Sequence, residues 1–344
     1  MLIVSDAWRP QVNGVVRTLA TVTDELRALG HHVEVVGPDR FRTIPCPTYP
    51  DIRLSILPKR RLARIIEQFA PDHLHIATEG PLGLAARAWA KRRRFAFTSS
   101  FHTRFPEYIH ARTGIPVGIA YAFLRRFHND ASATLIATRS LQEDLAGRGF
   151  TRLVRWSRGV DLARFNPQPR RDWATEYNVA RPIFLYVGRI AVEKNIDAFL
   201  ELELPGSKIV VGGGPQLAAL KARYPDVVFT GPFSEAELAA AYAGGDVFVF
   251  PSRTDTFGLV VLEALACGVP VAAYDVTGPK DILGDASGHV GAFGPDLRAS
   301  ALAALDADRG DCRAHAERFT WAACAGIFLS ALVPLAAGTT SAKN

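Results

Sequence analysis

The stretch VFVFPSRTDTFGLVVLEALACGVPVAAYD, residues 247–275, has the pattern of one complete strand–helix–strand unit. The runs 247–252 and 270–275 are short, β-branched and apolar on both faces, as expected of buried parallel strands. The segment 259–267 between them has the pattern of a helix. This order of elements predicts a parallel sheet built from strand–helix–strand units.

The same alternation extends through most of the chain in two series. The first predicts strands at 2–6, 33–37, 73–77, 95–100 and 133–138, and the second predicts strands at 183–188, 208–212, 227–231, 247–252 and 270–275. Helical patterns lie between them, for example at 15–29, 81–93, 215–223, 235–243 and 259–267. The segment 158–182 separates the two series and is interpreted as a linker. We therefore expect two doubly wound α/β domains with a cleft between them, in which ligands bind at the carboxyl ends of the strands.

The composition excludes several classes of protein. With 344 residues, 48% hydrophobic and 22% charged, the chain is long enough for two cores and is neither disordered nor fibrous. Its four cysteines have no C-x-x-C spacing, which argues against a disulfide scaffold or a structural zinc site and favours a reducing cytoplasm. The first residues, MLIVSD, have the pattern of a strand and not of a signal peptide. The longest apolar stretch, 327–337, contains Pro334 and is too short for a straight membrane span.

Charge is distributed unevenly along the chain. Residues 1–165 contain 25 Lys and Arg against 14 Asp and Glu, a net charge of +11, whereas residues 166–344 contain 15 against 20, a net charge of −5. The difference predicts a basic face on the N-terminal domain and an anionic partner, which would be a membrane lipid, a nucleic acid or a phosphorylated substrate. The alternative is that the excess of basic residues reflects arginine-rich usage alone.

Two loops that follow strands of the first series contain candidate site residues. Gly14 lies at the start of a helix, where a glycine lets backbone N–H groups approach an anion. His102 lies just past a predicted strand beside Arg104, where it is placed to hydrogen-bond a ligand. The alternatives are an ordinary glycine turn and a solvated loop histidine.

Two loops of the second series carry stronger signals. Arg189 and Lys194 are five positions apart after a strand and are suited to clamp a diphosphate. After a later strand, Asp255 can accept hydrogen bonds from ligand hydroxyls, and Gly258 begins a helix whose first amides suit a phosphate. Glu263 follows in the same apolar helix, where a carboxylate without a partner would be costly. Hydroxyls, phosphate and further hydroxyls in this order describe a sugar joined to a nucleoside through a diphosphate. The alternatives are a surface basic pair at Arg189 and Lys194 and, at Glu263, an interior helix charge with a local partner.

The four loops together resemble those of glycosyltransferase family 4. TDTFGLVVLEALACGVPV (254–271) is similar to the family's acidic-x7-Glu signature, and VGRIAVEKN (187–195) is similar to its Arg/Lys diphosphate motif. PQVNGVV (10–16) resembles its N-terminal glycine loop, and SFHT (100–103) resembles its active-site histidine strand. The motifs occur in family order and span most of the chain, so together they are specific. Within the family, the resemblance is to the bacterial glucosyl- and mannosyltransferases that synthesise glycolipids.

The resemblance implies a GT-B fold, in which two Rossmann-like, doubly wound parallel-sheet domains face a central cleft. The acceptor domain would be 1–163 and the nucleotide-sugar donor domain 164–311, and a C-terminal helix at 312–335 would cross back to the first domain. It also implies that a hexose is transferred from a UDP- or GDP-linked sugar with retention of configuration. No divalent metal and no cofactor other than this co-substrate is implied.

The family's functional roles carry over to the matching positions. The acidic pair would hold the donor sugar and the ribose, and the basic pair would neutralise the diphosphate, which the glycine loop approaches. The amides of the Phe-Gly-Leu triplet would bind sugar and phosphate, and the histidine would contact the transferred sugar. The implied donor-binding set is Gly14, Arg189, Lys194, Asp255, Phe257, Gly258, Leu259 and Glu263, and the implied catalytic set is His102, Arg189, Lys194 and Asp255.

Two positions depart from the family pattern. Asp255 stands where most members carry Glu, and its shorter side chain alters how a sugar can be held. Gly213, in the run GGGP at 212–215, stands where an acidic residue is usual. Asp306 and Asp308 have D-x-D spacing but lie in an alanine-rich helical pattern, so they are interpreted as surface charge and not as a metal site.

The acceptor is predicted from the basic N-terminal half. The helical pattern at 58–70 has an apolar face beside four basic residues, Lys59, Arg60, Arg61 and Arg64, and a second basic run lies at 91–94. Such residues can hold a domain on anionic lipid, and the aromatic and basic segment 101–128 is placed to line an acceptor entrance. We expect a cytoplasmic enzyme, peripheral on the inner face of the cytoplasmic membrane, that glycosylates a lipid such as diacylglycerol.

Three alternative functions remain open from the residues alone. A soluble glycosyltransferase would modify a sugar or a small metabolite. A sugar-nucleotide epimerase of the same fold would convert a donor without an acceptor. A non-catalytic nucleotide- or nucleic-acid-binding module would use the basic half, but the sequence has no recognition helix, RNA-binding aromatic signature or zinc finger, so no nucleic-acid partner is expected.

Overall fold

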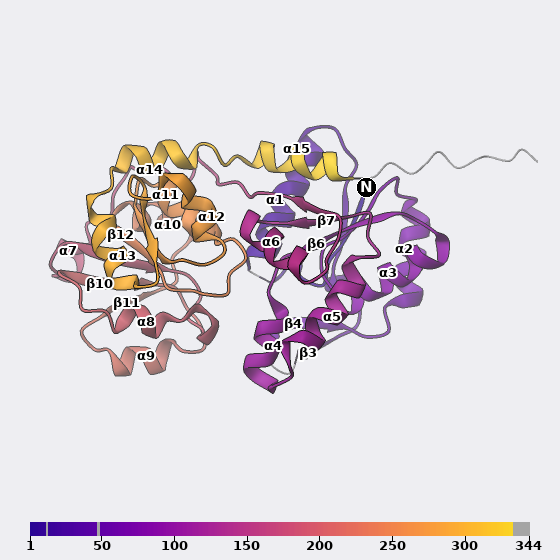
Figure 1. The fold of residues 1–344 in the computed structure, drawn as a ribbon, viewed down its shortest axis with the longest axis horizontal. Helices are drawn as coiled ribbons and strands as arrows, with labels where there is room; N and C mark the ends of the chain where they lie inside the picture. Colours follow the sequence, from indigo (N-terminus) through magenta and orange to yellow (C-terminus); the bar gives the residue numbers. More distant parts are fainter. Residues whose placement is uncertain (12, 47–48, 333–344) are drawn as a thin grey trace, which may run out of the picture. The chain divides into compact units, whose positions relative to one another are not determined.

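The computed structural model describes residues 1–11, 13–46 and 49–332, which form two compact units. One unit comprises Met1–Ser157 and the segment that begins at Ala322, and the other comprises Arg158–Trp321 (Figure 1). The chain therefore passes from one unit to the other twice. The domain boundaries expected from the sequence, 163/164 and 311/312, both lie inside the second unit.

The first unit is built on a six-stranded sheet in which every neighbouring pair is parallel. In spatial order its strands are β2 (Glu34–Val36), β1 (Leu2–Val4), β5 (Leu74–Ile76), β6 (Phe97–Phe101), β7 (Ala133–Ile136) and β8 (Leu153–Arg155). The strand order reverses between β1 and β5, which makes that position a topological switch point. The five strands predicted for this half are confirmed, and the edge strand β8 is additional.

Helices cover this sheet, and their apolar positions form its core. They are α1 (Gly14–Ala28), α2 (Lys59–Phe69), α3 (Pro81–Arg93), α4 (Phe105–Thr113), α5 (Val117–His128), α6 (Arg139–Gly147) and α15 (Trp321–Ala331), with the 3-10 turn η1 (Pro38–Arg40). An antiparallel pair, β3 (Thr43–Cys46) and β4 (Tyr49–Ser55), precedes α2. α2 and α3 bury Leu62, Ile66 and Trp89 in one cluster with β1 and β5.

The C-terminal helix α15 packs on this first unit. The Trp156 indole N–H donates to the Cys324 carbonyl at 3.0 Å, and the Phe328 ring lies 5.1 Å from the Trp156 ring and 4.8 Å from that of His75. The helix predicted at 312–335 is therefore two helices in the described residues, because α14 (Arg309–Ala316), in the second unit, ends before α15 begins at Trp321; residues 333–335 lie outside the described ranges. No helix in the described ranges has both the length and the apolar content needed to cross a membrane.

The second unit contains another six-stranded, all-parallel sheet. In spatial order its strands are β11 (Val228–Gly231), β10 (Ser207–Val211), β9 (Ile183–Val187), β12 (Val247–Phe250), β13 (Val271–Tyr274) and β14 (Gly291–Gly294). Numbered within this unit the order is 3-2-1-4-5-6, which is the Rossmann order, and its switch point lies between β9 and β12. The five predicted strands are confirmed, and the edge strand β14 is additional.

The segment interpreted as a linker, 158–182, packs on the second unit and is not a free connection. Phe165 and Trp173 in it are fully buried, and the Trp173 indole N–H donates to the Ala241 carbonyl at 3.1 Å. The remaining helices of this unit are α7 (Trp173–Tyr177), α8 (Ile196–Leu200), α9 (Leu217–Arg223), α10 (Glu235–Ala243), α11 (Leu259–Ala266), α12 (Pro279–Leu283) and α13 (Leu297–Ala303), with 3-10 turns η2 (Val192–Lys194), η3 (Gly284–Ala286) and η4 (Ala304–Asp306).

Candidate functional site

Two of the predicted loops meet at the switch point of the second sheet. β9 and β12 are adjacent parallel strands, so the loop after β9, residues 188–195, lies beside the loop after β12, residues 251–258. We call them the paired loops. Lys194 Nζ in one loop lies 2.6 and 2.9 Å from the two carboxylate oxygens of Asp255 in the other. The structure thus brings together a diphosphate candidate and a sugar candidate where open α/β sheets bind ligands.

Three further hydrogen bonds join the paired loops. The Asn195 side-chain amide donates to the Pro251 carbonyl at 3.0 Å. The hydroxyls of Ser252 and Thr254 reach the Glu193 carbonyl at 3.5 and 3.3 Å. The ion pair between Lys194 and Asp255 is therefore one of several contacts that fix one loop against the other.

Arg189 is exposed at the start of the first paired loop, and a hydrogen bond from β9 holds its backbone. The Tyr186 hydroxyl donates to the Arg189 carbonyl at 2.8 Å. Burial, followed by the nearby carboxylates of Asp255 and Glu193, raises the pKa of Tyr186 well above its ordinary value. The phenol therefore stays protonated and remains a donor to this loop.

The glycine run at 212–214 packs against the same loop. A Cβ at Gly212 would lie 1.9 Å from the Gly188 carbonyl oxygen, and one at Gly214 would lie 2.3 Å from that of Ile190, so both positions exclude a side chain. Gly213 differs, because its nearest neighbour to a Cβ would be Pro232 at 3.8 Å. The departure at Gly213 is thus not imposed by packing.

The second paired loop turns into α11 through a left-handed glycine. Gly258 has φ +89° and ψ 73° and is the N-cap residue, and α11 begins at Leu259. Phe257 before it is buried, and its carbonyl is so close to Gly278 that a Cβ there would lie 2.4 Å away. The helix N-terminus carries partial positive charge, which favours an anion at this place.

Glu263 lies in α11 and is buried, with 2% of the residue exposed. Its Oε2 accepts a hydrogen bond from the Tyr242 hydroxyl of α10 at 2.9 Å. Tyr242 is fully buried, and the sequence reasoning missed it, although a tyrosine within alanine-rich α10 is a usable signal. Glu263 and Asp255 therefore have different surroundings, and their joint contact with one ligand stays a prediction.

In the first unit, His102 and Gly14 occupy the predicted places after strands. His102 directly follows β6, is 9% exposed, and contacts the Trp156 ring edge-on at 5.7 Å between ring centroids. Gly14 is the first residue of α1. The sequence reasoning missed Asn13, whose side-chain oxygen accepts from the Val15 and Val16 amides at 3.0 Å each and caps the helix.

The switch point of the first sheet is fixed by a buried carboxylate. Asp6, after β1, accepts from the Leu82 amide at 2.8 Å, the Gly83 amide at 3.2 Å and the Thr78 hydroxyl at 2.9 Å. Leu82 and Gly83 belong to the first turn of α3 and Thr78 to the loop before it, so Asp6 caps that helix from the loop after β1. Burial raises the pKa of Asp6.

A histidine beneath this edge has a structural environment. His75 lies between the hydroxyls of Thr98 and Ser100, each 2.9 Å from one ring nitrogen. Its complete burial lowers its pKa to about 3, so the ring is neutral. His75 thus serves packing and hydrogen bonding in the sheet.

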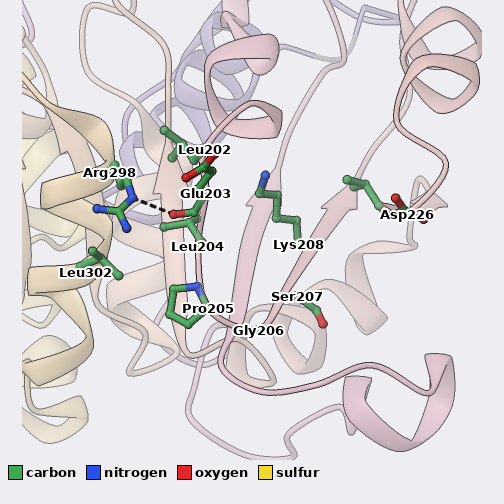
Figure 2. A pocket seen from close by; sticks show the side chains of 11 residues that line it. Leu202, Glu203, Leu204, Pro205, Gly206, Ser207, Lys208, Asp226, Arg298 and Leu302 are labelled. Carbon is green, nitrogen blue, oxygen red and sulfur yellow. Dashed lines mark hydrogen bonds between the residues drawn. The ribbon is translucent and has the colours of Figure 1, made fainter.

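Two features lie away from the predicted site. Asp308 accepts from the Gly310 and Asp311 amides at 2.7 and 3.0 Å and caps α14, so its place in the D-x-D pair is structural. A pocket of about 760 Å³ lies at the start of β10, and the Arg298 guanidinium donates to the Glu203 carbonyl there at 2.8 Å. Figure 2 shows the side chains that line it. This cavity lies at the opposite sheet edge from the paired loops, and no predicted site residue lines it.

The chain matches known families of glycosyltransferases. Residues 12–164 match the family model described as Glycosyltransferase Family 4, and residues 181–306 match that of Glycosyl transferases group 1. The chain is 35% identical to a GDP-mannose-dependent alpha-mannosyltransferase of Mycobacterium tuberculosis, over 82% of this chain and 80% of that protein. It is 27% identical to an alpha-monoglucosyldiacylglycerol synthase of Streptococcus pneumoniae, over 78% of this chain and 70% of that protein.

A solved structure shares the fold. Sucrose-phosphate synthase of Thermosynechococcus elongatus superposes with a TM-score of 0.71 at 20% identity, over 96% of this chain and 97% of that one. Together with the two parallel sheets, this likeness confirms the predicted GT-B class with two Rossmann-like domains.

Proposed function

Because the chain belongs to glycosyltransferase family 4 and is a glycosyltransferase, we propose that it moves a hexose from a nucleotide-diphosphate sugar to a lipid hydroxyl. We propose further that it retains the anomeric configuration and needs no divalent metal. The observation that carries the donor half of this proposal is the meeting of the paired loops at the switch point of the second sheet. It brings Lys194 into contact with Asp255 on the loop that leads into α11, and Arg189 lies in the same paired loop as Lys194.

The residue types at the paired loops fit the charge that the reaction develops. When the bond between the sugar and the diphosphate breaks, negative charge accumulates on the leaving phosphate. A guanidinium, an ammonium and the amides of a helix start stabilise such charge without reorganisation. Loss of one preorganised donor of this kind typically lowers the rate by about 10²–10³-fold. We therefore assign diphosphate binding to Arg189, Lys194 and the turn at Gly258.

The donor is proposed to be GDP- or UDP-linked, with GDP-mannose as the first to be tested. The mycobacterial relative is named for GDP-mannose. The roles of His102 and Gly14 in the first unit, toward the transferred sugar and the diphosphate, remain part of the same proposal.

A lipid acceptor is supported by the surface of the first unit. The pneumococcal relative is named for a diacylglycerol product. The start of α2 exposes a basic cluster, Lys59, Arg60, Arg61 and Arg64. Leu57, two residues before the cluster, has an exposed fraction of 89%. Each Lys or Arg near an anionic bilayer contributes about 1 kcal/mol to binding.

The helical hairpin of α4 and α5 adds an apolar surface to the same unit. Phe105 and Ile109 on α4, Ile115 between the helices, and Ile119 and Phe123 on α5 are each at least 37% exposed. Exposed apolar side chains that gather on one surface are typical of interaction sites. The exposed charges that follow on α5, Arg125 and Arg126, are basic, which suits anionic lipid headgroups. We therefore propose that the first unit contacts an anionic membrane.

Binding of nucleotides in the presence of EDTA tests the donor half. We expect a thermal shift with GDP or with UDP on the wild-type protein, loss of that shift in Arg189→Ala, and its retention in Arg298→Ala at the opposite sheet edge. A folded wild-type protein that responds to neither nucleotide would contradict the donor site. A response that requires added Mg²⁺ would contradict metal independence.

Flotation with liposomes tests the membrane half. We expect binding to anionic liposomes at low salt, weaker binding at high salt, and a loss in Arg60→Glu/Arg61→Glu. Arg139→Glu, at an exposed position of α6 in the same unit, serves as the control. Absence of binding at low salt would remove the membrane contact while leaving the glycosyltransferase assignment in place. The configuration of the product, read by NMR, tests retention.

A further inference from the structure

We infer that Asp255 acts as a positioning residue, which holds the Lys194 ammonium in place for the donor diphosphate, and does not itself hold the donor sugar. This inference rests on the donor site proposed above and concerns how that site works. It differs from the role that the family resemblance gives to the first acidic residue of the signature.

The contacts of Asp255 point toward Lys194. Both carboxylate oxygens lie within 2.9 Å of the same Nζ, and the two side chains are only 18% and 26% exposed. An aspartate carries its carboxylate one methylene closer to the backbone than the usual glutamate does. In this chain the shorter side chain of Asp255 contacts Lys194 of the neighbouring loop.

The ion pair belongs to the way the paired loops are built. The Asn195 amide bonded to Pro251 and the Thr254 hydroxyl bonded to Glu193 bracket it on both sides. These contacts involve only this chain, so they bring Lys194 and Asp255 together before a donor binds. The ion pair is therefore one of the contacts that join the paired loops.

Holding the lysine has a physical benefit for diphosphate binding. A lysine side chain has a flexible four-carbon stem and loses rotamer freedom when it binds a phosphate. A carboxylate on the next loop removes much of that freedom in advance, which preorganises the site. Because the pair is net neutral, the net positive charge at the diphosphate comes from Arg189 and the N-terminus of α11, and Lys194 supplies a directed donor.

A comparison of two ligands separates the two roles. Calorimetry would measure the affinity of GDP and GDP-mannose, and of UDP and UDP-glucose, for the wild type, Asp255→Asn, Lys194→Met and the double variant. Positioning acts on the phosphates that both members of each pair share. We therefore expect Asp255→Asn to lower the affinities for nucleotide and nucleotide sugar by the same factor, with their ratio constant within about twofold, and to have no effect in the Lys194→Met background.

The opposite pattern would overturn the inference. If Asp255 holds the sugar, Asp255→Asn weakens only the nucleotide sugar, by about tenfold or more for a lost hydrogen bond to a charged group, and does so in the Lys194→Met background as well. If the affinity of Lys194→Met is too low to measure, the ratio for Asp255→Asn alone decides. A wild type that binds no nucleotide would instead remove the proposed function, and this inference with it.

A matched control lies on the next loop of the same sheet edge. Asp275, after β13, forms an ion pair with Lys280 at 3.0 Å. Asp275→Asn removes the same kind of pair and is expected to leave both affinities unchanged. Asp255→Glu, which keeps a carboxylate that can reach Lys194, is expected to restore the wild-type ratio and most of the affinity. Thermal melts of all variants confirm that each is folded.

Discussion

Replacement of Tyr242 by phenylalanine tests whether a buried hydroxyl holds Glu263 in place. The hydroxyl donates to Glu263 Oε2 at 2.9 Å, and the two residues are 0% and 2% exposed. The substitution keeps the ring, and with it the edge contact to Phe248 at 5.7 Å. A hydrogen bond to a charged group contributes about 1.5–3 kcal/mol. We therefore expect the free energy of unfolding of the second unit to fall by that amount.

The assay is urea denaturation of the intact chain, combined with a double-mutant cycle in which Glu263→Gln is the second change. We expect the two substitutions to be coupled by about 1 kcal/mol or more, because each removes the same interaction. Tyr224→Phe is the matched control, because its hydroxyl bonds to Glu201 at 3.2 Å on the surface and its loss should cost less than about 0.5 kcal/mol. Additive effects in the cycle, or equal losses at Tyr242 and Tyr224, would refute the reasoning.

Three further predictions concern the stability of each unit. Burial lowers the pKa of His75 from 6.5 to about 3, so the folded state binds the proton less well than the unfolded chain. The free energy of unfolding should therefore fall below pH 6.5, by about 2 kcal/mol at pH 5. Urea denaturation at pH 7.5 and at pH 5 should show this loss in the wild type but not in His75→Gln. Gly278→Ala places a Cβ 2.4 Å from the Phe257 carbonyl at φ +98°, whereas the Cβ of Gly288→Ala meets nothing within 4 Å at φ +94°. Calorimetric melting should show a larger loss of stability for Gly278→Ala than for Gly288→Ala, and Gly278→Ala should also bind nucleotide more weakly. Asp6→Ala leaves two buried amides of α3 without their acceptor and should lower the unfolding free energy of the first unit by about 2–4 kcal/mol, as measured by urea denaturation.

The interior strands could be predicted from the sequence because each is buried on both faces and forms a short apolar run. Of the four edge strands, β2 and β11 were predicted, but β8 and β14 could not be. β8 has the sequence LVR and β14 has the sequence GAFG, so neither forms a β-branched apolar run, and their residues are mostly half-buried. The packing of 158–182 on the second unit could not be predicted either, because its composition is that of a linker. Its prolines and charges outnumber the two anchoring side chains, Phe165 and Trp173, which only the packed structure reveals as fully buried.

For the candidate site, the positions of the residues could be predicted from the sequence, but their contacts could not. Residue types just past strand ends could be predicted from motifs, because the carboxyl edge of a parallel sheet is where such loops gather. Which side chains contact each other could not, because Lys194 and Asp255 are 61 positions apart and meet only through the strand order that places β9 beside β12. Motif spacing assigned these two residues to different groups of one ligand, whereas the packed loops pair them with each other. The charge that the proposed diphosphate would meet at the paired loops therefore depends on strand order as much as on the residues that the motif supplies.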